Sequence, residues 1–250
     1  MRLKRWHIVI GGVVLAVLIF LGALFLPRMG QFRAASALSK VRSSVAQAGK
    51  QSQMSGEGYV SPVDFEALQA GNGDIYGWLY IPGTEVNEPL LQRDGDSQYY
   101  LNHNSLGLED DSGALFTESA YNSKDFSDTA TVIYGKNSQE GRLFGDLQAL
   151  YSSSAGLQEH KEIIVYLPDE EIHYEVFAAV PIRSNHLLYY YDFDNTKRYE
   201  MFLEVVNAVR TVDAHRDNQV EVAPGDQLLI LQTNRGNSSL ICYLVLAKRT

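Results

Sequence analysis

The chain has 250 residues, 45% of them hydrophobic, which is enough for the core of one domain and leaves little for a second. Its single cysteine excludes an intramolecular disulfide, and its six histidines lack HxxxH or HExxH spacing, so the sequence predicts no metal and no other cofactor. Residues 1–50 carry eight Lys/Arg and no Asp/Glu, which leaves 13 basic against 30 acidic residues in the rest, a net charge of −17. A body this acidic argues against a nucleic-acid partner.

An uncharged segment follows a short basic tail at residues 1–7. Ile8–Leu26 contains nineteen residues without a charge, close to the ~20 that a helix needs to cross a bilayer. A cleaved signal peptide has a shorter apolar region and a small-x-small site, which "LFLPRMG" does not offer. We therefore expect a single-pass membrane anchor at 8–26. Basic residues flank both ends, so the positive-inside signal is modest, but we expect a cytoplasmic N-terminus and an extracellular body.

The next segment, 27–60, is rich in Ala, Ser, Gln and Lys. Phe32, Leu38, Val41 and Val45 are spaced as in a weakly amphipathic helix. We expect a juxtamembrane helix or stalk that lifts the folded domain, 61–250, off the bilayer.

From Ser61 onward the sequence pattern is typical of short strands separated by turn residues. Helical periodicity appears at Asp64–Gln69, Leu143–Tyr151 and Thr196–Val209. Strands are expected at Ile75–Ile81, Glu88–Gln92, Gly113–Thr117, Ala130–Tyr134, Glu162–Leu167 and Ile172–Ile182, followed by a closing hairpin within Gln227–Lys248. About eight short strands with few helices predict a mostly-β fold, a closed or partly closed barrel.

Six sequence blocks, in order, resemble those of class B sortases. They are "FEALQAGNGDIYGWLYIPGTEVNEPLLQ", "YYLNHNSLG", "GALFTE", "TVIYGKNSQEGRLFGDL", "EIIVYLPDEEIHYEVFAAV" and "LLILQTN" with "YLVLAKR". The resemblance covers about Asp64 to Arg249. It implies an eight-stranded sortase barrel on the outer face of a Gram-positive cell, with a helix at about Thr196–Val209.

The resemblance also implies a catalytic triad. In the family a cysteine thiolate attacks a Thr carbonyl in a sorting signal, a histidine protonates the leaving amine and an arginine stabilises the oxyanion. At these positions the chain has Asn234 after Thr233, Lys136 in "YGKN", and Cys242 on the last strand. An amide is no nucleophile, and a lysine near its ordinary pKa of ~10.4 does not exchange protons at neutral pH.

The arginine position depends on the register of the last strand, because the loop Arg235–Ser238 looks shorter than usual. Ser239–Ala247 contains no arginine or lysine, so only Arg235 could supply a positive charge by reaching back. Thr233, Asn137 and Arg235 flank the substituted positions and are the candidate binding residues.

Each substitution also has a plain structural interpretation. Asn234 is a residue type that ends strands at turns, Cys242 is a small apolar side chain in an apolar strand, and Lys136 can project into solvent. His103, in "LNHNSLG", is expected to be structural. Two other hypotheses remain open. Cys242 could act as a nucleophile with Lys136 lowering its pKa, or Lys136 and Asn234 could form an isopeptide bond if an apolar pocket held them beside a carboxylic acid.

The sequence therefore predicts a membrane-anchored, class B sortase-like pseudoenzyme at the cell surface. Its groove would bind a peptide that resembles a sorting signal, or a pilin or other surface protein, because binding and bond-making use different residues. The alternative is an active cysteine transpeptidase with an atypical site. The sequence alone does not decide whether the chain is an enzyme.

Overall fold

The computed structural model describes residues 33, 35–48, 59–138, 143–236, 238 and 240–250. The predicted basic tail and the predicted membrane span at 8–26 lie outside the described residues. None of the helices in the described part combines the length and the apolar character needed to cross a bilayer.

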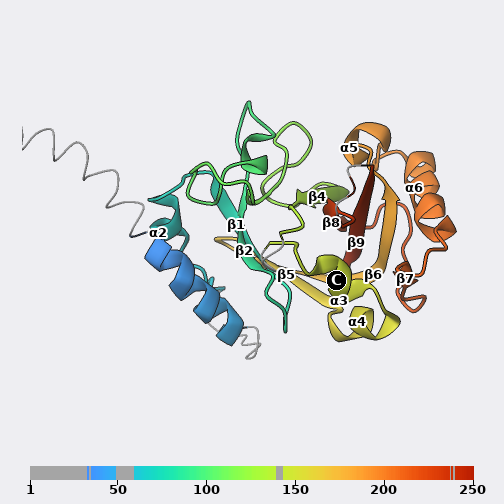
Figure 1. The fold of residues 1–250 in the computed structure, drawn as a ribbon, viewed down its shortest axis with the longest axis horizontal. Coiled ribbons are helices and arrows are strands. Elements are labelled where there is room, and N and C mark those ends of the chain that lie inside the picture. Colours follow the sequence, from blue (N-terminus) through green and yellow to red (C-terminus); the bar gives the residue numbers. More distant parts are fainter. Residues whose placement is uncertain (1–32, 34, 49–58, 139–142, 237, 239) are drawn as a thin grey trace, which may run out of the picture.

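Eight strands form a closed barrel, with α-helices around it (Figure 1). The order is β5-β1-β2-β3-β4-β8-β9-β6, and pairing of β6 with β5 closes the ring. The bounds are β1 Ile75–Tyr80, β2 Asn87–Leu91, β3 Leu115–Phe116, β4 Ala130–Tyr134, β5 Glu162–Tyr166, β6 Glu171–Arg183, β8 Leu228–Asn234 and β9 Ile241–Arg249. A two-residue strand, β7 (His215–Arg216), pairs with β6. The prediction of a mostly-β barrel is confirmed.

Side chains alternate between the inside and the outside of the barrel, as the pleat of a strand requires. Leu231 on β8 and Val245 on β9 belong to the interior cluster, whereas their neighbours Ile230 and Leu244 belong to an outer cluster. The interior cluster is closed at one end by α3 (Leu147–Tyr151) and α4 (Ser154–Glu159), which contribute Leu147, Tyr151 and Leu157.

The helix predicted at Leu143–Tyr151 is shorter than expected. Leu143 has a φ of 55°, in the left-handed region that helices exclude, and it bridges to Asn137 instead. The helix therefore begins only at Leu147. Apolar spacing alone did not reveal this, because Leu143 and Phe144 are buried as a helical stripe would be.

The outer cluster lies beneath α5 (Leu187–Tyr190) and α6 (Thr196–Ala208), which pack on the β6, β8 and β9 side. Asn195 caps α6 by accepting the Arg198 N–H. Tyr199, Phe202 and Val206 are the buried stripe of this helix, while Val205 on the same helix is 41% exposed.

A third cluster joins the N-terminal helix, 35–48, to the β1–β2 side of the barrel. Leu38, Val41 and Val45 are buried there against a core that includes Trp78, together with α2 (Phe65–Gln69) and the 3₁₀ turn η1 (Tyr99–Leu101). The expected amphipathic helix exists, but it packs on the barrel, so the described part of segment 27–60 is not a free spacer.

Candidate functional site

The residues predicted to replace the triad meet at one end of β4, β8 and β9. Asn234 is directly opposite Cys242 in the antiparallel β8–β9 ladder. The parallel β4–β8 ladder ends at Tyr134 opposite Gln232, and each chain continues for two residues, to Lys136 and Asn234 respectively. The topology therefore brings together residues that are about 100 positions apart in the chain.

Cys242 is buried, with 1% of its surface exposed, in the apolar cluster beneath α5 and α6. Its Sγ lies 3.7 Å from the carbonyl oxygen of Ile182 and 3.9 Å from that of Arg183, to which the thiol donates weakly. Burial raises the pKa of the thiol to about 11. At pH 7 only about one thiol in ten thousand would be ionised, which is the reverse of the low pKa that a nucleophilic cysteine needs.

Lys136 and Asn234 have polar surroundings. The Lys136 Nζ donates to the backbone carbonyl of Asp111 at 2.7 Å, and the Asn234 side chain is exposed. Neither residue sits in the apolar pocket that isopeptide formation would need. The structure thus gives no support to a crosslink between them.

Arg235 faces away from the side that Asn234 and Cys242 share. Its Nε and Nη2 donate to the two carboxylate oxygens of Asp213 at 2.8 and 3.0 Å, a bidentate pair on the Tyr243 side of the hairpin. Burial would raise the pKa of Asp213, but hydrogen bonds from Thr211 and Arg235 outweigh it and hold this pKa below its usual value. Arg235 is therefore engaged in a structural ion pair and does not reach back to the substituted site.

The other predicted residues have clear positions. Thr233 is buried opposite Tyr243, and its hydroxyl has no hydrogen-bond partner among the described residues. Asn137 donates to the Gly236 carbonyl at 3.5 Å, a long contact between the end of β4 and the hairpin. His103 stacks on Tyr99 with ring centroids 3.7 Å apart, as expected of a structural residue.

A second polar cluster lies beside the site and was missed by the sequence analysis. His186 Nε2 and the buried Glu118 Oε2 are 2.7 Å apart, and His186 Nδ1 accepts the Tyr189 N–H that begins α5. Because Nδ1 is an acceptor, the neutral ring carries its proton on Nε2 and donates it to the carboxylate. Both ring nitrogens are thus occupied, and neither is free to act as a base for Cys242.

Tyr134 lies next to this pair, with its ring centroid 6.4 Å from that of His186. Its hydroxyl is buried beside the Glu118 carboxylate. Burial, followed by the charge of Glu118, raises its pKa strongly. The only sequence signal for Glu118 was its place at the end of "GALFTE"; no pattern connected it with His186, 68 residues later.

Two clefts in the described part of the chain are lined by residues other than the substituted triad. One cleft, of about 330 Å³, lies at the start of β4 between residues 121–130 and residues 188–194. Another lies beside helix 35–48. Neither is lined by Lys136, Asn234 or Cys242, and the Cys242 side chain packs in the outer cluster that also contains Leu187 of α5.

Comparison with known proteins supports the resemblance. No protein-family model matches the chain. Sortase B of Listeria monocytogenes is 30% identical over 166 residues, 66% of this chain and 65% of that protein. Sortase B of Staphylococcus aureus is 25% identical over 174 residues, 68% of this chain and 66% of that protein. The matched region thus spans just under two thirds of each relative.

Solved structures show the same fold. The S. aureus sortase B structure has a TM-score of 0.69 at 24% identity and covers 87% of this chain and 98% of that one. The S. aureus sortase B–substrate complex has a TM-score of 0.68 at 24% identity, with coverages of 86% and 94%. A Bacillus anthracis sortase B in complex with AAEK2 has a TM-score of 0.63 at 26% identity, with coverages of 74% and 82%.

The closed barrel and its likeness to these structures define a protein with the sortase fold. Within that fold, the curated relatives are sortases B. Together, the sequence matches and the shared fold support a class B sortase-like family for this chain.

Proposed function

We propose that this protein is a membrane-anchored pseudo-sortase, which binds an extended peptide of the sorting-signal type, alone or as part of a pilin or other surface protein, without cleaving it. The observation that carries the proposal is the pair at the end of β8 and β9: an exposed amide opposite a thiol that is 1% exposed and has a pKa of about 11. Neither group is a nucleophile at neutral pH.

The charged groups near the pair do not restore the chemistry. Lys136 donates to a loop carbonyl, Arg235 is paired with Asp213, and His186 uses both nitrogens structurally. Peptide binding is supported by the family fold and by the substrate complex solved for the S. aureus protein. Anchoring is supported by the uncharged segment at 8–26. The position of the barrel on the outer face of a Gram-positive cell is part of the proposal, and it is supported by the resemblance to class B sortases.

The test is a panel of sorting-signal peptides assayed twice with the full chain in detergent or vesicles. Binding is followed by fluorescence anisotropy, and hydrolysis or transfer to an amine by mass spectrometry. We expect saturable binding of at least one peptide and no product. A peptide thioester at Cys242, or turnover that Cys242→Ala abolishes, would establish the alternative, an active cysteine transpeptidase. Absence of binding across the panel would contradict the peptide-binding proposal.

A further inference from the structure

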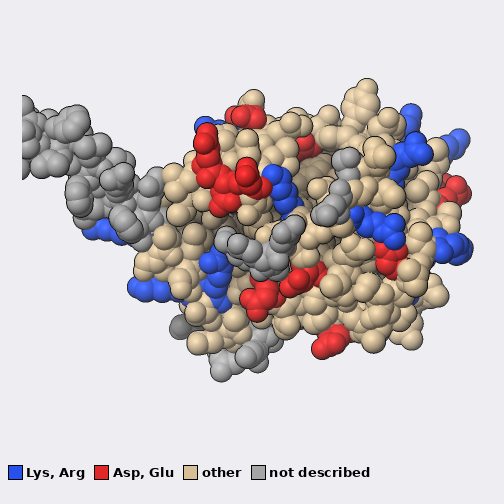
Figure 2. Space-filling view, viewed as in Figure 1, with Lys and Arg blue, Asp and Glu red and all other residues tan. Residues whose placement is uncertain are grey.

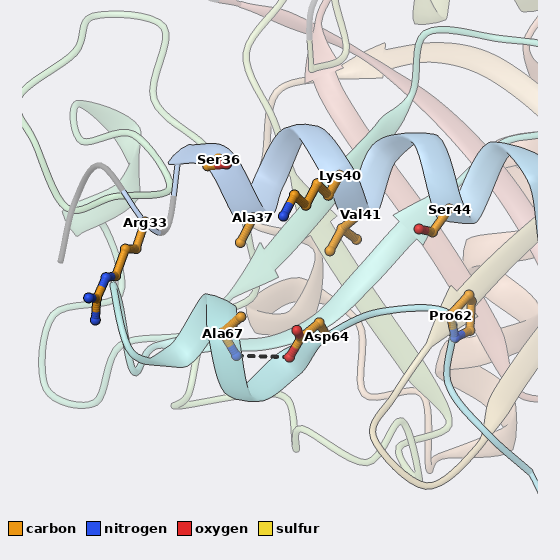
Figure 3. Close-up of a pocket in the computed structure, with 9 residues that line it drawn as sticks. All are labelled: Arg33, Ser36, Ala37, Lys40, Val41, Ser44, Pro62, Asp64 and Ala67. Atoms are coloured by element: carbon orange, nitrogen blue, oxygen red, sulfur yellow. Dashed lines mark hydrogen bonds between the residues drawn. The ribbon is translucent and has the colours of Figure 1, made fainter. Parts of the chain in front are cut away.

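A groove of about 560 Å³ lies between helix 35–48 and α2 (Figure 3), on the side of the molecule away from β8 and β9 (Figure 1). Helix 35–48 forms one wall and the segment around α2 forms the other. Nine residues line it: Arg33, Ser36, Ala37, Lys40, Val41, Ser44, Pro62, Asp64 and Ala67.

The mouth of the groove is positively charged. Arg33 and Lys40 are both exposed and are seven residues apart, two helical turns or about 10 Å along one face. The single acidic residue among those lining the groove, Asp64, is used locally, since its carboxylate accepts the Ala67 N–H as the N-cap of α2. Small side chains between the two cations leave room for a bulky group.

The opposite face of helix 35–48 fixes its orientation. Leu38 and Val45 are buried in the third cluster, on the β1–β2 side of the barrel, and Arg42 Nη2 donates to the buried carboxylate of Glu88 at 2.7 Å. The Arg33 and Lys40 face is therefore held toward the outside of the molecule. Figure 2 shows basic side chains on the surface that this helix forms.

Charge and chain length together indicate what this face meets. The body after residue 50 has a net charge of −17, so an anionic surface would repel it, whereas residues 1–50 carry eight basic and no acidic residues. The predicted span ends at Leu26, and seven residues of fully extended chain reach at most about 25 Å. In an anchored chain, Arg33 must lie within that distance of the bilayer.

We propose that the groove docks against the headgroup layer of a bilayer rich in anionic phospholipid, whose phosphates are received by Arg33 and Lys40. This inference rests on the proposed membrane anchoring. Docking here would set the tilt of the barrel on the membrane and leave the acidic surface, with the substituted site, facing away from it.

The experiment uses the full chain, with Cys242→Ala, reconstituted in two kinds of vesicle. Neutral vesicles contain phosphatidylcholine alone, and anionic vesicles contain phosphatidylcholine with about 40% phosphatidylglycerol. A fluorophore is placed at Gln47→Cys, an exposed position on the same face, one helical repeat beyond Lys40. Quenching by a lipid with a spin-labelled headgroup reports docking.

We expect stronger quenching in the anionic vesicles, and weaker quenching at high salt. For Arg33→Glu with Lys40→Glu, the docked-to-undocked ratio should fall by about fivefold or more per residue, given about 1 kcal/mol for each basic side chain near such a surface.

The matched control is Lys197→Glu with Arg198→Glu, the same charge change on exposed positions of α6 at the other end of the molecule. It should leave the quenching unchanged. Vesicle flotation after alkaline extraction tests the anchor separately. A chain that is extracted refutes the anchor, and with it the docking. A chain that floats but is quenched equally in both vesicle types, or equally after both double substitutions, refutes the docking alone.

Discussion

At the scale of single residues, the chemistry of Cys242 is set by what surrounds its sulfur. The thiol lies among apolar side chains and contacts the backbone carbonyls of Ile182 and Arg183, which accept a hydrogen bond from the thiol but do not stabilise a thiolate. Lys136, the cation that could have lowered the thiol pKa, donates instead to Asp111. Burial decides the outcome, and it raises the pKa to about 11.

We therefore expect slow alkylation of Cys242 by iodoacetamide in the native protein. The rate should rise about tenfold per pH unit between pH 7 and 10, because the thiolate fraction rises in this way below a pKa of about 11. The matched control is Leu240→Cys with Cys242→Ala, which places the thiol at a 75% exposed position on the same hairpin. It should react at least about a hundredfold faster at pH 7. Similar rates for the two thiols would contradict the burial argument.

The positions of these residues could be predicted from the sequence to different degrees. Alternation along Ile241–Ala247 placed Cys242 on an apolar face, and the structure buries it there. The direction of Arg235 was not predictable, because its partner Asp213 is 22 residues away on a different connection. The Glu118–His186 pair was missed for the same reason: a contact between distant loops leaves no periodic signal in either segment.

At the scale of elements, helix 35–48 is attached to the barrel by a polar latch as well as by apolar packing. Arg42 donates to the Glu88 carboxylate, the Asn87 side chain donates to the Arg42 carbonyl, and Trp78 Nε1 donates to Asn87. The sequence showed the amphipathic spacing of this helix. It could not show the contact between Arg42 and Glu88, because the sequence indicates only that Glu88 lies in a strand. The contact appears when the fold packs helix 35–48 against β2.

Substituting Arg42→Ala should loosen this helix. The substitution leaves the Glu88 carboxylate, whose side chain is 8% exposed, without its charged partner, which costs roughly 1–3 kcal/mol. We expect faster amide hydrogen exchange in 35–48 and earlier proteolysis there, with little change in the barrel strands. Ser39→Ala, at an exposed position on the same helix, is the control and should match the unmodified protein. Uniform loss of protection throughout the barrel would show that the latch supports the whole fold.

At the scale of the whole molecule, the closed barrel is held together by side chains other than those at the predicted triad positions. The strands are held by the interior cluster, to which Leu231 and Val245 contribute, whereas Asn234 and Cys242 lie on the outer face. The family blocks in the sequence were enough to predict this barrel. They did not predict which side chains would surround Cys242, since that depends on how α5 and α6 pack on the outer face of β9.

The same packing determines what happens when the triad is restored. Lys136→His and Asn234→Cys change half-buried and exposed positions, so the double variant should fold with a stability within about 0.5 kcal/mol of the unmodified protein. Its new thiol should be alkylated quickly, but we expect no cleavage of a sorting peptide, because no cation faces a developing oxyanion.

Adding Cys242→Arg supplies that cation at a position that is 1% exposed in an apolar cluster, which should destabilise the protein by about 3 kcal/mol or more. Thermal unfolding and peptide hydrolysis, measured together on the double and triple variants, separate loss of fold from loss of chemistry. Weak hydrolysis by a stably folded triple variant would instead show that the outer cluster around position 242 rearranges to admit an arginine, and that only the three side chains separate this barrel from an enzyme.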